Sequence, residues 1–382
     1  MSVDKEPLTA FGPRVRKSPF FDATRRYGCN AYTVYNHTYM PLYYEDRVTD
    51  YWRLVNDVTL WDVAGQRQVE VTGPDAARFV QMLTPRNLSK CKVGQCKYVF
   101  ITNEEGGIIN DPVLLRLGEN HFWLSLADSD VLLWAQGIAV NSEFNVNITE
   151  PDVSPLQVQG PKSTLVMRPL FGDRINDLRY FWFKETDLHG IPVVVSRTGW
   201  SSERGYEIFL RDNQHGDRLW ETVMEAGKPY NIGPCAPSHI RRIEGGLLSY
   251  GSDITLSENP FELGFGKFVD LDQEANFIGK PALQRIKTEG VKRQLVGLEI
   301  DGTSLGAGNE HPWAMFHNDR HVGKLTSSVY SPRLKKNIGI AIVDLEHSRE
   351  GTRLDVEIPK GERQAMIVPF PFYDPEKSIP VS

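Results

Sequence analysis

Four stretches of the sequence place more polar and aromatic residues at turns than a scaffold needs. In one, a Gly106-Gly107 turn delivers Asp111 to the start of a strand; in another, Glu207 follows a loop and stands four residues after Glu203. Loops that lead into regular elements commonly carry binding and catalytic side chains. Such residues could bind or protonate a ligand through carboxylates that neighbouring aromatic and basic groups support. The stretches are 103–112, 198–208, 241–253 and 331–339.

Each stretch also has a purely structural interpretation. An aspartate near a Gly-Gly turn commonly caps that turn, and the residues alone favour this role for Asp111. Strand alternation places Tyr206 and Ile208 on one face and Glu207 on the other, where a glutamate could simply face solvent. The third stretch is typical of a charged helix that ends in glycines, and the fourth of a basic hairpin turn. None of the four is specific by itself.

Several cofactor and metal signatures are missing. The sequence has no HExxH, no Walker A loop and no complete GxGxxG, so neither nicotinamide nor ATP chemistry is indicated. Four cysteines, at 29, 91, 96 and 235, are too few and scattered to staple a fold of this size. The pair at 91 and 96 lacks a second pair to complete a zinc site. We therefore expect reduced thiols and no metal.

The composition is that of an ordinary globular protein with a mildly acidic balance. The 382 residues include 43 Lys and Arg against 49 Asp and Glu, a formal net charge of −6. A general nucleic-acid binder would need an excess of basic residues on one face. No apolar run approaches the roughly 20 residues that span a bilayer. Met1 to Phe21 carries charges throughout instead of an apolar signal-peptide core. We expect a cytoplasmic protein that binds neither nucleic acid nor membrane.

The elements that must position these stretches repeat along the chain. A strand, a Gly-Pro turn and a helix follow one another around Gly73 and again around Gly160, so the two units are 87 residues apart. A second strand and helix follow each unit at a similar offset. This pattern predicts two related α+β halves with antiparallel sheets. The second pairs of segments are 122–126 with 130–138, and 206–210 with 218–226.

After about residue 290 the pattern changes to closely spaced strands without convincing helices, which is typical of a small β-barrel or sandwich. A polar segment at 289–293 is the expected link. We expect three domains: a first α+β half at 1–150, which could be discontinuous, a second half at 151–290, and a strand-rich domain at 291–382. The expected strands are 294–300, 321–330, 338–345, 353–358 and 365–370.

Together, and in this order, the four stretches are specific. The sequence resembles the folate-dependent glycine-cleavage T-protein (aminomethyltransferase) family. Its pattern is Gly-Gly-x-x-x-Asp, a Gly-Glu-x-Gly-Tyr-Glu-like segment, Arg-x-Glu-x-Gly-Leu and Ser-Pro-x-Leu-Lys-x-x-Ile-Gly. The resemblance runs from about Phe20 to Tyr373. It implies a three-domain α+β fold: two related α+β halves around a central opening that takes tetrahydrofolate, and a C-terminal β-barrel.

Within this family the sequence is similar to the members that demethylate dimethylsulfoniopropionate (DMSP). Two departures separate it from an authentic T-protein: Asn110-Asp111 replaces the usual Asp-Asp, and a loop with Trp200 replaces Gly-Tyr-Thr-Gly-Glu. An amide in place of a carboxylate beside the reaction centre points to a different one-carbon donor. The segments that carry this likeness are 31–37, 60–63, 83–90, 109–112, 123–130 and 199–201.

The resemblance implies roles for individual residues. Glu207 matches the carboxylate that hydrogen-bonds the pterin N–H groups, a strong orienting contact in a partly buried cleft. Tyr98 and Tyr206 are similar to aromatic residues beside the pterin, and Asp111 matches the acidic residue near folate N5 and N10. We therefore predict Asp111 as the catalytic residue, and Glu207, Tyr98 and Tyr206 as cofactor-binding residues.

A sulfonium donor such as DMSP would need neither a metal nor a covalent intermediate. Its positively charged sulfur is already a good leaving group, and folate N5 can attack the methyl carbon directly. The protein would then supply alignment and hold a cation, for which aromatic faces contribute roughly 0.5–2 kcal/mol each. We predict that Tyr32, Tyr35 and Trp200 bind the donor, with core packing as their alternative role.

The function we expect is a tetrahydrofolate-dependent methyltransferase that demethylates DMSP to methylmercaptopropionate and 5-methyltetrahydrofolate. Three alternatives stay open. They are an aminomethyltransferase of the glycine cleavage system, which would need a lipoylated carrier protein; a demethylase of another N-methyl or O-methyl donor; and a non-catalytic folate-binding protein, against which the retained Asp111 counts. The expected partners are the small-molecule methyl donor and tetrahydrofolate. A homodimer stays open, because the sequence does not determine the oligomeric state.

Overall fold

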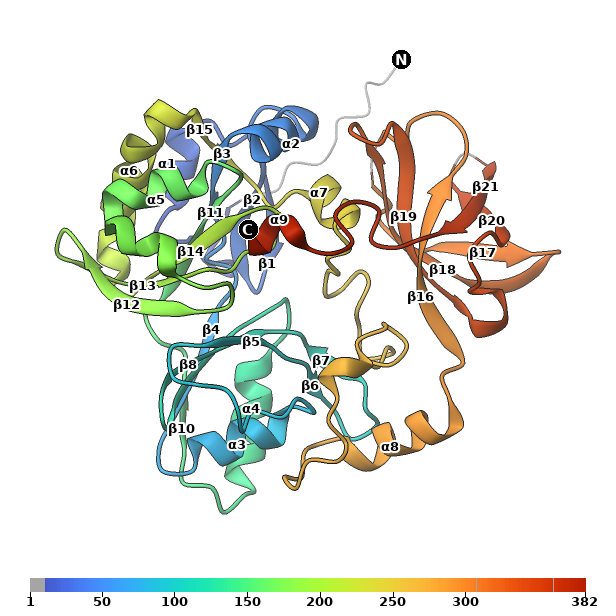
Figure 1. Cartoon of the computed structure of the whole chain (residues 1–382), viewed down its shortest axis with the longest axis horizontal. Coiled ribbons are helices and arrows are strands. Elements are labelled where there is room, and N and C mark those ends of the chain that lie inside the picture. Colours follow the sequence, from blue (N-terminus) through green and yellow to red (C-terminus); the bar gives the residue numbers. More distant parts are fainter. Residues whose placement is uncertain (1–10, 307, 360) are drawn as a thin grey trace.

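The computed structural model describes residues 11–306, 308–359 and 361–382, which form three lobes around a common centre (Figure 1). Residues 1–10 of the charged N-terminal stretch lie outside the described residues. Within these ranges, no helix is long and apolar enough to cross a membrane. Two lobes combine helices with a sheet and the third is a barrel, so the predicted α+β class is confirmed.

The first lobe is an antiparallel five-stranded sheet in the order β10-β4-β9-β8-β5. Helices α3 (Ala76–Leu83) and α4 (Val131–Val140) cover one face, because apolar residues of both helices pack on alternate strand residues such as Val69 and Val71. The strands are β4 (Gln68–Thr72), β5 (Cys96–Tyr98), β8 (Val113–Gly118), β9 (His121–Ser125) and β10 (Asn147–Thr149).

The second lobe is a six-stranded sheet in the order β12-β13-β14-β11-β3-β15, antiparallel except for the parallel β15 and β3 pair. Helices α1 (Phe21–Arg26), α5 (Ser163–Phe171) and α6 (Gly216–Gly227) cover one face. The strands are β3 (Val58–Asp62), β11 (Ser154–Gln159), β12 (Phe183–Leu188), β13 (Ile191–Ser196), β14 (Gly205–Leu210) and β15 (Ile232–Cys235).

The chain before residue 150 contributes to both sheets. Strand β11 is buried along its whole length and pairs with β14 on one side and β3 on the other. Because β3 precedes residue 150 and β11 follows it, the predicted division at 150 does not follow the sheets. The boundaries of the three domains stay predictions.

The repeated Gly-Pro turn has a structural cause in both sheets. Strand β4 leads through Gly73 into α3, and β11 leads through Gly160 into α5. The φ angles of these glycines are +117° and +125°, and a Cβ on either would lie 2.6 Å from a backbone carbonyl oxygen. Only glycine meets both conditions. The predicted strand-turn-helix repeat is therefore confirmed.

The sheet faces that the helices leave free pack against each other. The rings of Trp123 on β9 and Phe209 on β14 lie 6.2 Å apart, in an apolar cluster shared by both sheets. Strand alternation puts Glu207 on the same face as Phe209, and Tyr206 on the helix-covered face. The Glu207 side chain therefore lies between the two sheets.

The third lobe is a closed six-stranded barrel in the order β16-β19-β18-β17-β20-β21. Alternate residues such as Leu298, Leu325 and Val356 fill its interior. The predicted barrel is confirmed, although β17 was not among the predicted strands. The strands are β16 (Arg293–Ile300), β17 (Trp313–His317), β18 (Arg320–Ser331), β19 (Lys336–Asp344), β20 (Arg353–Ile358) and β21 (Gly361–Val368).

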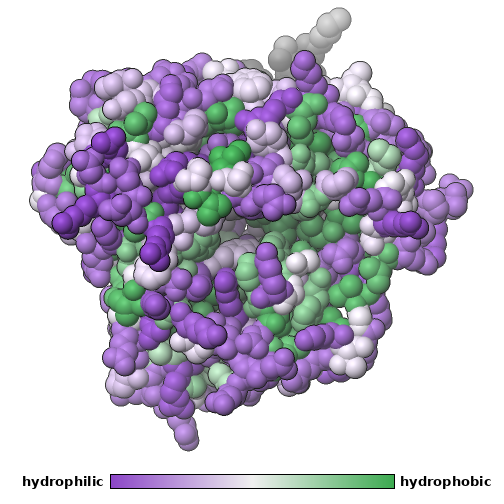
Figure 2. Space-filling view, in the orientation of Figure 1, coloured by the Kyte–Doolittle hydropathy of each residue, from purple (hydrophilic) through white to green (hydrophobic). Residues whose placement is uncertain are grey.

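Short elements between the lobes border the centre of the molecule, and Figure 2 shows that this face is hollowed there. The segment 245–268 follows α7 through the centre toward α8, which precedes the barrel (Figure 1). These elements are the hairpin of β1 (Ala31–Tyr35) and β2 (Thr38–Tyr43), α2 (Arg47–Asn56), the β6 (Ile101–Thr102) and β7 (Ile108–Asn110) pair, α7 (His239–Glu244), α8 (Lys280–Glu289) and α9 (Ser378–Val381).

Candidate functional site

Asp111 lies between β7 and β8, with its carboxylate buried against Tyr98 of β5. The Tyr98 hydroxyl donates a hydrogen bond of 2.9 Å to Asp111 Oδ2, whereas Asp111 Oδ1 is buried and accepts none from the described residues. Burial raises the pKa of Asp111 to about 7, although the hydrogen bond from Tyr98 opposes the rise. This carboxyl group can therefore hold or release a proton near neutral pH, and one oxygen is available to a ligand.

Two further tyrosines lie near the Asp111 carboxylate. Burial raises the pKa of Tyr250 to about 12, and the negative charge of Asp111 adds to the rise. Burial also raises the pKa of Tyr35, at the end of β1, followed by the charges of Asp111 and Asp128. Of these three phenols, Tyr98 contacts the Asp111 carboxylate, and Tyr35 and Tyr250 lie within range of its charge. Tyr250 belongs to the third sequence stretch, but spacing alone gave it no role.

Glu207 lies on β14 directly opposite Gln157 of β11. Gln157 Nε2 donates to Glu207 Oε1 at 2.7 Å, and the Thr198 hydroxyl donates to Oε2. Glu207 is 4% exposed, and burial raises the pKa of its carboxyl group. The neighbouring Gln157 Oε1 is buried and has no hydrogen-bond partner among the described residues. This strand pair therefore offers buried oxygen acceptors to the N–H groups of a ligand.

Tyr206 does not share a site with Glu207, contrary to the role that the sequence suggested. Its side chain is fully buried in the core beneath the helices of the second lobe, and its hydroxyl lies 3.1 Å from Thr164 Oγ1. Successive residues of a strand point to opposite faces, so the Tyr206 ring points away from the Glu207 carboxylate. In this structure Tyr206 supports the fold.

Tyr32 and Tyr35, two of the three predicted donor-binding residues, do not come together. They are three residues apart on β1, and strand geometry puts their side chains on opposite faces. The Tyr32 ring packs 5.1 Å from the ring of Phe21, and its hydroxyl pairs with Thr24 Oγ1 at 2.7 Å. Tyr35 lies on the side of Asp111. A cage built from both tyrosines is therefore not present.

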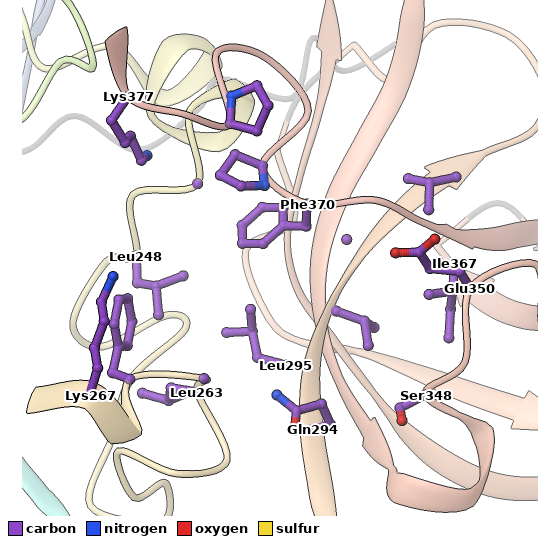
Figure 3. Close-up of a pocket in the computed structure, with 18 residues that line it drawn as sticks. Leu248, Leu263, Lys267, Gln294, Leu295, Ser348, Glu350, Ile367, Phe370 and Lys377 are labelled. Atoms are coloured by element: carbon purple, nitrogen blue, oxygen red, sulfur yellow. The ribbon is translucent and has the colours of Figure 1, made fainter. Parts of the chain in front are cut away.

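Trp200, the third predicted donor-binding residue, lies in the loop before β14. Its indole Nε1 donates to the carbonyl oxygen of Leu248 at 3.3 Å. Leu248 lines a cavity of about 520 Å³ between the 246–267 segment and the barrel (Figure 3). Trp200 therefore stands behind one wall of this cavity rather than beside Tyr32.

Apolar side chains, two amines and the Glu350 carboxyl group line the cavity. Leu248, Leu263 and Leu295 face its interior, and Figure 3 shows Lys267 and Lys377 on the same side. Burial, together with the positive charges of Arg241 and Lys267, lowers the pKa of Lys377 to about 8. The cavity therefore offers a ligand both apolar contacts and charged groups of either sign.

The cavity adjoins the Asp111 site through an aromatic contact. The ring of Phe265, which lines the cavity, lies 6.1 Å from the ring of Tyr98, and the Tyr98 hydroxyl holds Asp111. Sequence reasoning did not find the cavity, because its walls come from the segment after α7, two barrel strands and the tail after the barrel.

The third and fourth sequence stretches form a buried polar network. Arg242 on α7 makes an ion pair of 2.5 Å with Asp253, and Ser331 Oγ donates to Glu244 at 2.6 Å. All four side chains are buried, so the network ties α7 to the barrel.

The cysteines are free thiols, as predicted. Across the described ranges, no group of three or more His, Cys, Asp or Glu side chains is arranged to hold a metal ion.

Known proteins are similar to this chain in both sequence and fold. The GCVT N-terminal domain matches residues 20–273, and the glycine cleavage T-protein C-terminal barrel domain matches residues 293–374. The dimethylsulfoniopropionate demethylase of Ruegeria pomeroyi is 39% identical over 354 residues, which cover 93% of this chain and 96% of the relative. The aminomethyltransferase of Bacillus subtilis is 31% identical over 365 residues, which cover 94% and 99%.

A solved structure has the same architecture. The glycine cleavage system aminomethyltransferase T of Bartonella henselae matches with a TM-score of 0.85 over 94% of this chain and 98% of its own, at 22% identity. The resemblance carried by the four stretches is thus confirmed along nearly the whole sequence. The chain belongs to the glycine-cleavage T-protein family of folate-dependent enzymes.

Proposed function

We propose that the protein is a tetrahydrofolate-dependent methyltransferase that demethylates DMSP to methylmercaptopropionate and 5-methyltetrahydrofolate. The observation that carries the proposal is the 39% identity with a DMSP demethylase across 93% of the chain, against 31% with an aminomethyltransferase across 94%. Asn110 and the Trp200 loop, which depart from the T-protein pattern, support the same donor. Its partners would be these two small molecules, and a homodimer stays a prediction.

The residues between the two sheets fit the pterin ring of tetrahydrofolate. A pterin presents N–H donors, and the Glu207 carboxylate and Gln157 Oε1 offer buried acceptors on adjacent strands. Hydrogen bonds to an ionised carboxylate are charge-assisted and therefore strong and orienting. We assign the pterin to Glu207, with Gln157 as a second contact that the sequence analysis did not name.

Asp111 and Tyr98 form the part of the site that we assign to chemistry. When bound, tetrahydrofolate supplies the N5 nitrogen that accepts the methyl group. With a pKa of about 7, Asp111 can hold or release a proton at Oδ1, while the Tyr98 hydroxyl fixes Oδ2. In its ionised form the same carboxylate attracts a positively charged donor. Because a sulfonium already carries a good leaving group, the main task of these residues is alignment.

Tyr35 is the aromatic residue that we retain for the donor. It lies near Asp111, because the neighbouring residues Asn36 and Asn110 both donate to the Ala127 carbonyl group. An aromatic face together with a carboxylate stabilises a cation better than either group alone. Tyr32 belongs to a separate aromatic cluster. Trp200, whose indole donates to the Leu248 carbonyl oxygen, stays a predicted donor-binding residue.

A glycine-cleavage aminomethyltransferase is the second candidate, because relatives with that name are 31% identical over 94% of the chain. Such an enzyme would act on an aminomethyl group attached to a lipoylated carrier protein. Its folate product would be 5,10-methylenetetrahydrofolate instead of the 5-methyl form. The product therefore separates the two candidates.

The test incubates the purified protein and tetrahydrofolate with a panel of donors and identifies the folate product by mass. The panel contains DMSP, an N-methyl amine, an O-methyl aromatic acid and an aminomethylated lipoyl carrier. We expect 5-methyltetrahydrofolate with DMSP. Formation of 5,10-methylenetetrahydrofolate with the carrier, and no product with DMSP, would replace the first candidate with the second.

A further inference from the structure

One residue at the tip of the β1–β2 hairpin, Asn36, is buried against the rest of the molecule, whereas its neighbour His37 is exposed. Its two turn residues, Asn36 and His37, have φ angles of 47° and 59°, which are typical of a two-residue hairpin turn. Asn36 is only 4% exposed. Its backbone N–H donates to Asp128 Oδ1 at 2.8 Å, and its side-chain Nδ2 donates to the carbonyl oxygens of Ala127 at 2.7 Å and Gly65 at 3.0 Å.

The segment 127–129, which binds Asn36, also holds Asn110, the residue next to Asp111. Asn110 is fully buried, and its Nδ2 donates to the Ala127 carbonyl oxygen at 3.0 Å and to Ser129 Oγ at 2.7 Å. Its Oδ1 accepts from the Ala127 N–H at 3.0 Å. Two asparagine amides, from Asn36 and Asn110, therefore meet on one carbonyl group. The hairpin tip and the strand end that carries Asp111 share one anchor.

At both positions the amide group of asparagine supplies the N–H donors that these carbonyl groups accept. An ionised carboxylate accepts hydrogen bonds but donates none, so aspartate at 36 or at 110 would remove one of the two donors to the Ala127 carbonyl group. Asp128, in contrast, supplies an acceptor, because its carboxylate receives the Asn36 backbone N–H.

The anchor fixes Tyr35, the residue before the turn. The Tyr35 side chain packs on Gly65, where an added Cβ would lie 3.4 Å from both Cβ and Cδ1 of Tyr35 and 3.0 Å from its carbonyl oxygen. Gly65 also receives the Asn36 side chain through its carbonyl group. Gly65 therefore contacts both Tyr35 and the neighbouring turn residue Asn36, which fixes the position of the tyrosine.

We propose that Asn36, Asp128 and Asn110 are positioning residues for the methyl donor, which hold the hairpin so that Tyr35 stays beside Asp111. The claim rests on the proposed function, because it takes Asp111 and Tyr35 as the donor end of the site. The hairpin then forms one wall of that site, and the strength of its anchor sets the affinity for the donor without altering the folate contacts at Glu207.

The test compares three variants of the full chain. Asp128→Ala removes the acceptor of the Asn36 N–H, whereas Asp128→Asn keeps an oxygen in its place. The control is Asp130→Ala, which removes a neighbouring carboxylate that is 61% exposed and lies 3.7 Å from His37 Nε2. Amide hydrogen exchange of residues 31–43, KM and kcat with DMSP, and the Kd of tetrahydrofolate are measured for each variant.

We expect Asp128→Ala to accelerate exchange in the hairpin about tenfold and to raise KM for DMSP by a similar factor, as loss of one hydrogen bond to a charged group allows. The Kd of tetrahydrofolate should not change, and kcat should fall less than about threefold. Asp128→Asn should restore both properties, and Asp130→Ala should match the wild type.

Unchanged exchange in Asp128→Ala would show that the hairpin is held by other contacts and would overturn the proposal. Faster exchange with an unchanged KM would also overturn it, as would an equal rise of KM in Asp130→Ala. If the wild-type protein does not demethylate DMSP, the proposed function fails by itself, and KM is then compared with the panel donor that is turned over. If no donor is turned over, both proposals fail.

Discussion

The buried carboxyl group of Asp111 should make the stability of the folded protein depend on pH. Its pKa in the folded protein is about 7, above the ordinary aspartate value of 3.8, so the folded state binds the proton more tightly than the unfolded state. The stability that this proton provides is fully present below about pH 4 and is lost as the pH rises through 7.

Asp111→Asn removes that loss. As the pH rises from 4 to 8, the difference in the free energy of unfolding between the variant and wild type should shift by about 1–4 kcal/mol in favour of the variant. The turnover of the variant should fall. Urea denaturation at the two pH values measures the gain, and other titrating groups cancel in the comparison. A stability difference that is the same at both pH values would mean that Asp111 has an ordinary pKa.

Glu207→Gln tests the pterin assignment. A carboxylate that accepts at both oxygens becomes an amide that accepts at one, so tetrahydrofolate binding should weaken by roughly 1.5–3 kcal/mol. Tyr206→Phe is the matched control, because its ring lies on the opposite face of β14 and its hydroxyl contacts Thr164. That variant should bind the cofactor like wild type. Titration calorimetry measures the Kd of tetrahydrofolate for each variant. Equal affinities for Glu207→Gln and wild type would refute the assignment.

At the scale of one element, β1 distinguishes two tyrosines that the sequence treats alike. Tyr35→Leu should raise KM for DMSP by roughly 2- to 30-fold, because it removes an aromatic face worth about 0.5–2 kcal/mol near Asp111. Tyr32→Leu should leave KM unchanged and lower the melting temperature, because its ring packs on Phe21. Steady-state kinetics and thermal unfolding of both variants check this. A larger KM effect at Tyr32 would contradict the placement of the two side chains.

Elements with a local signature were predictable from the sequence. The repeated units at Gly73 and Gly160 gave α3 and α5, because a positive φ and a close carbonyl group demand glycine there. Alternation along the second stretch already separated Tyr206 from Glu207, yet the family pattern assigned both to one ligand. The same period separates Tyr32 from Tyr35. Likeness to a motif says which residues are present, whereas the pleat of the strand decides which side chains share a face, and it places the members of each pair on opposite faces.

At the scale of the whole molecule, the site depends on contacts between segments that are distant in the sequence. Asp111 comes from the first lobe, Glu207 from the second, and the cavity beside Tyr98 is closed by barrel residues such as Leu295 and by the tail around Lys377. No local pattern encodes such a cavity. The hairpin anchor is equally non-local, because Asn36 and Asp128 are 92 residues apart. The order of the motifs could therefore predict the family, but not the walls of the site.

The central claim is that a methyl group passes from a sulfonium donor to folate. A single-turnover reaction with tetrahydrofolate and DMSP labelled with ¹³C in both methyl groups tests it most directly. The account predicts 5-methyltetrahydrofolate that is one mass unit heavier than the unlabelled compound, with an equal amount of singly labelled methylmercaptopropionate. Unlabelled or absent 5-methyltetrahydrofolate, from protein that binds the cofactor, would contradict it.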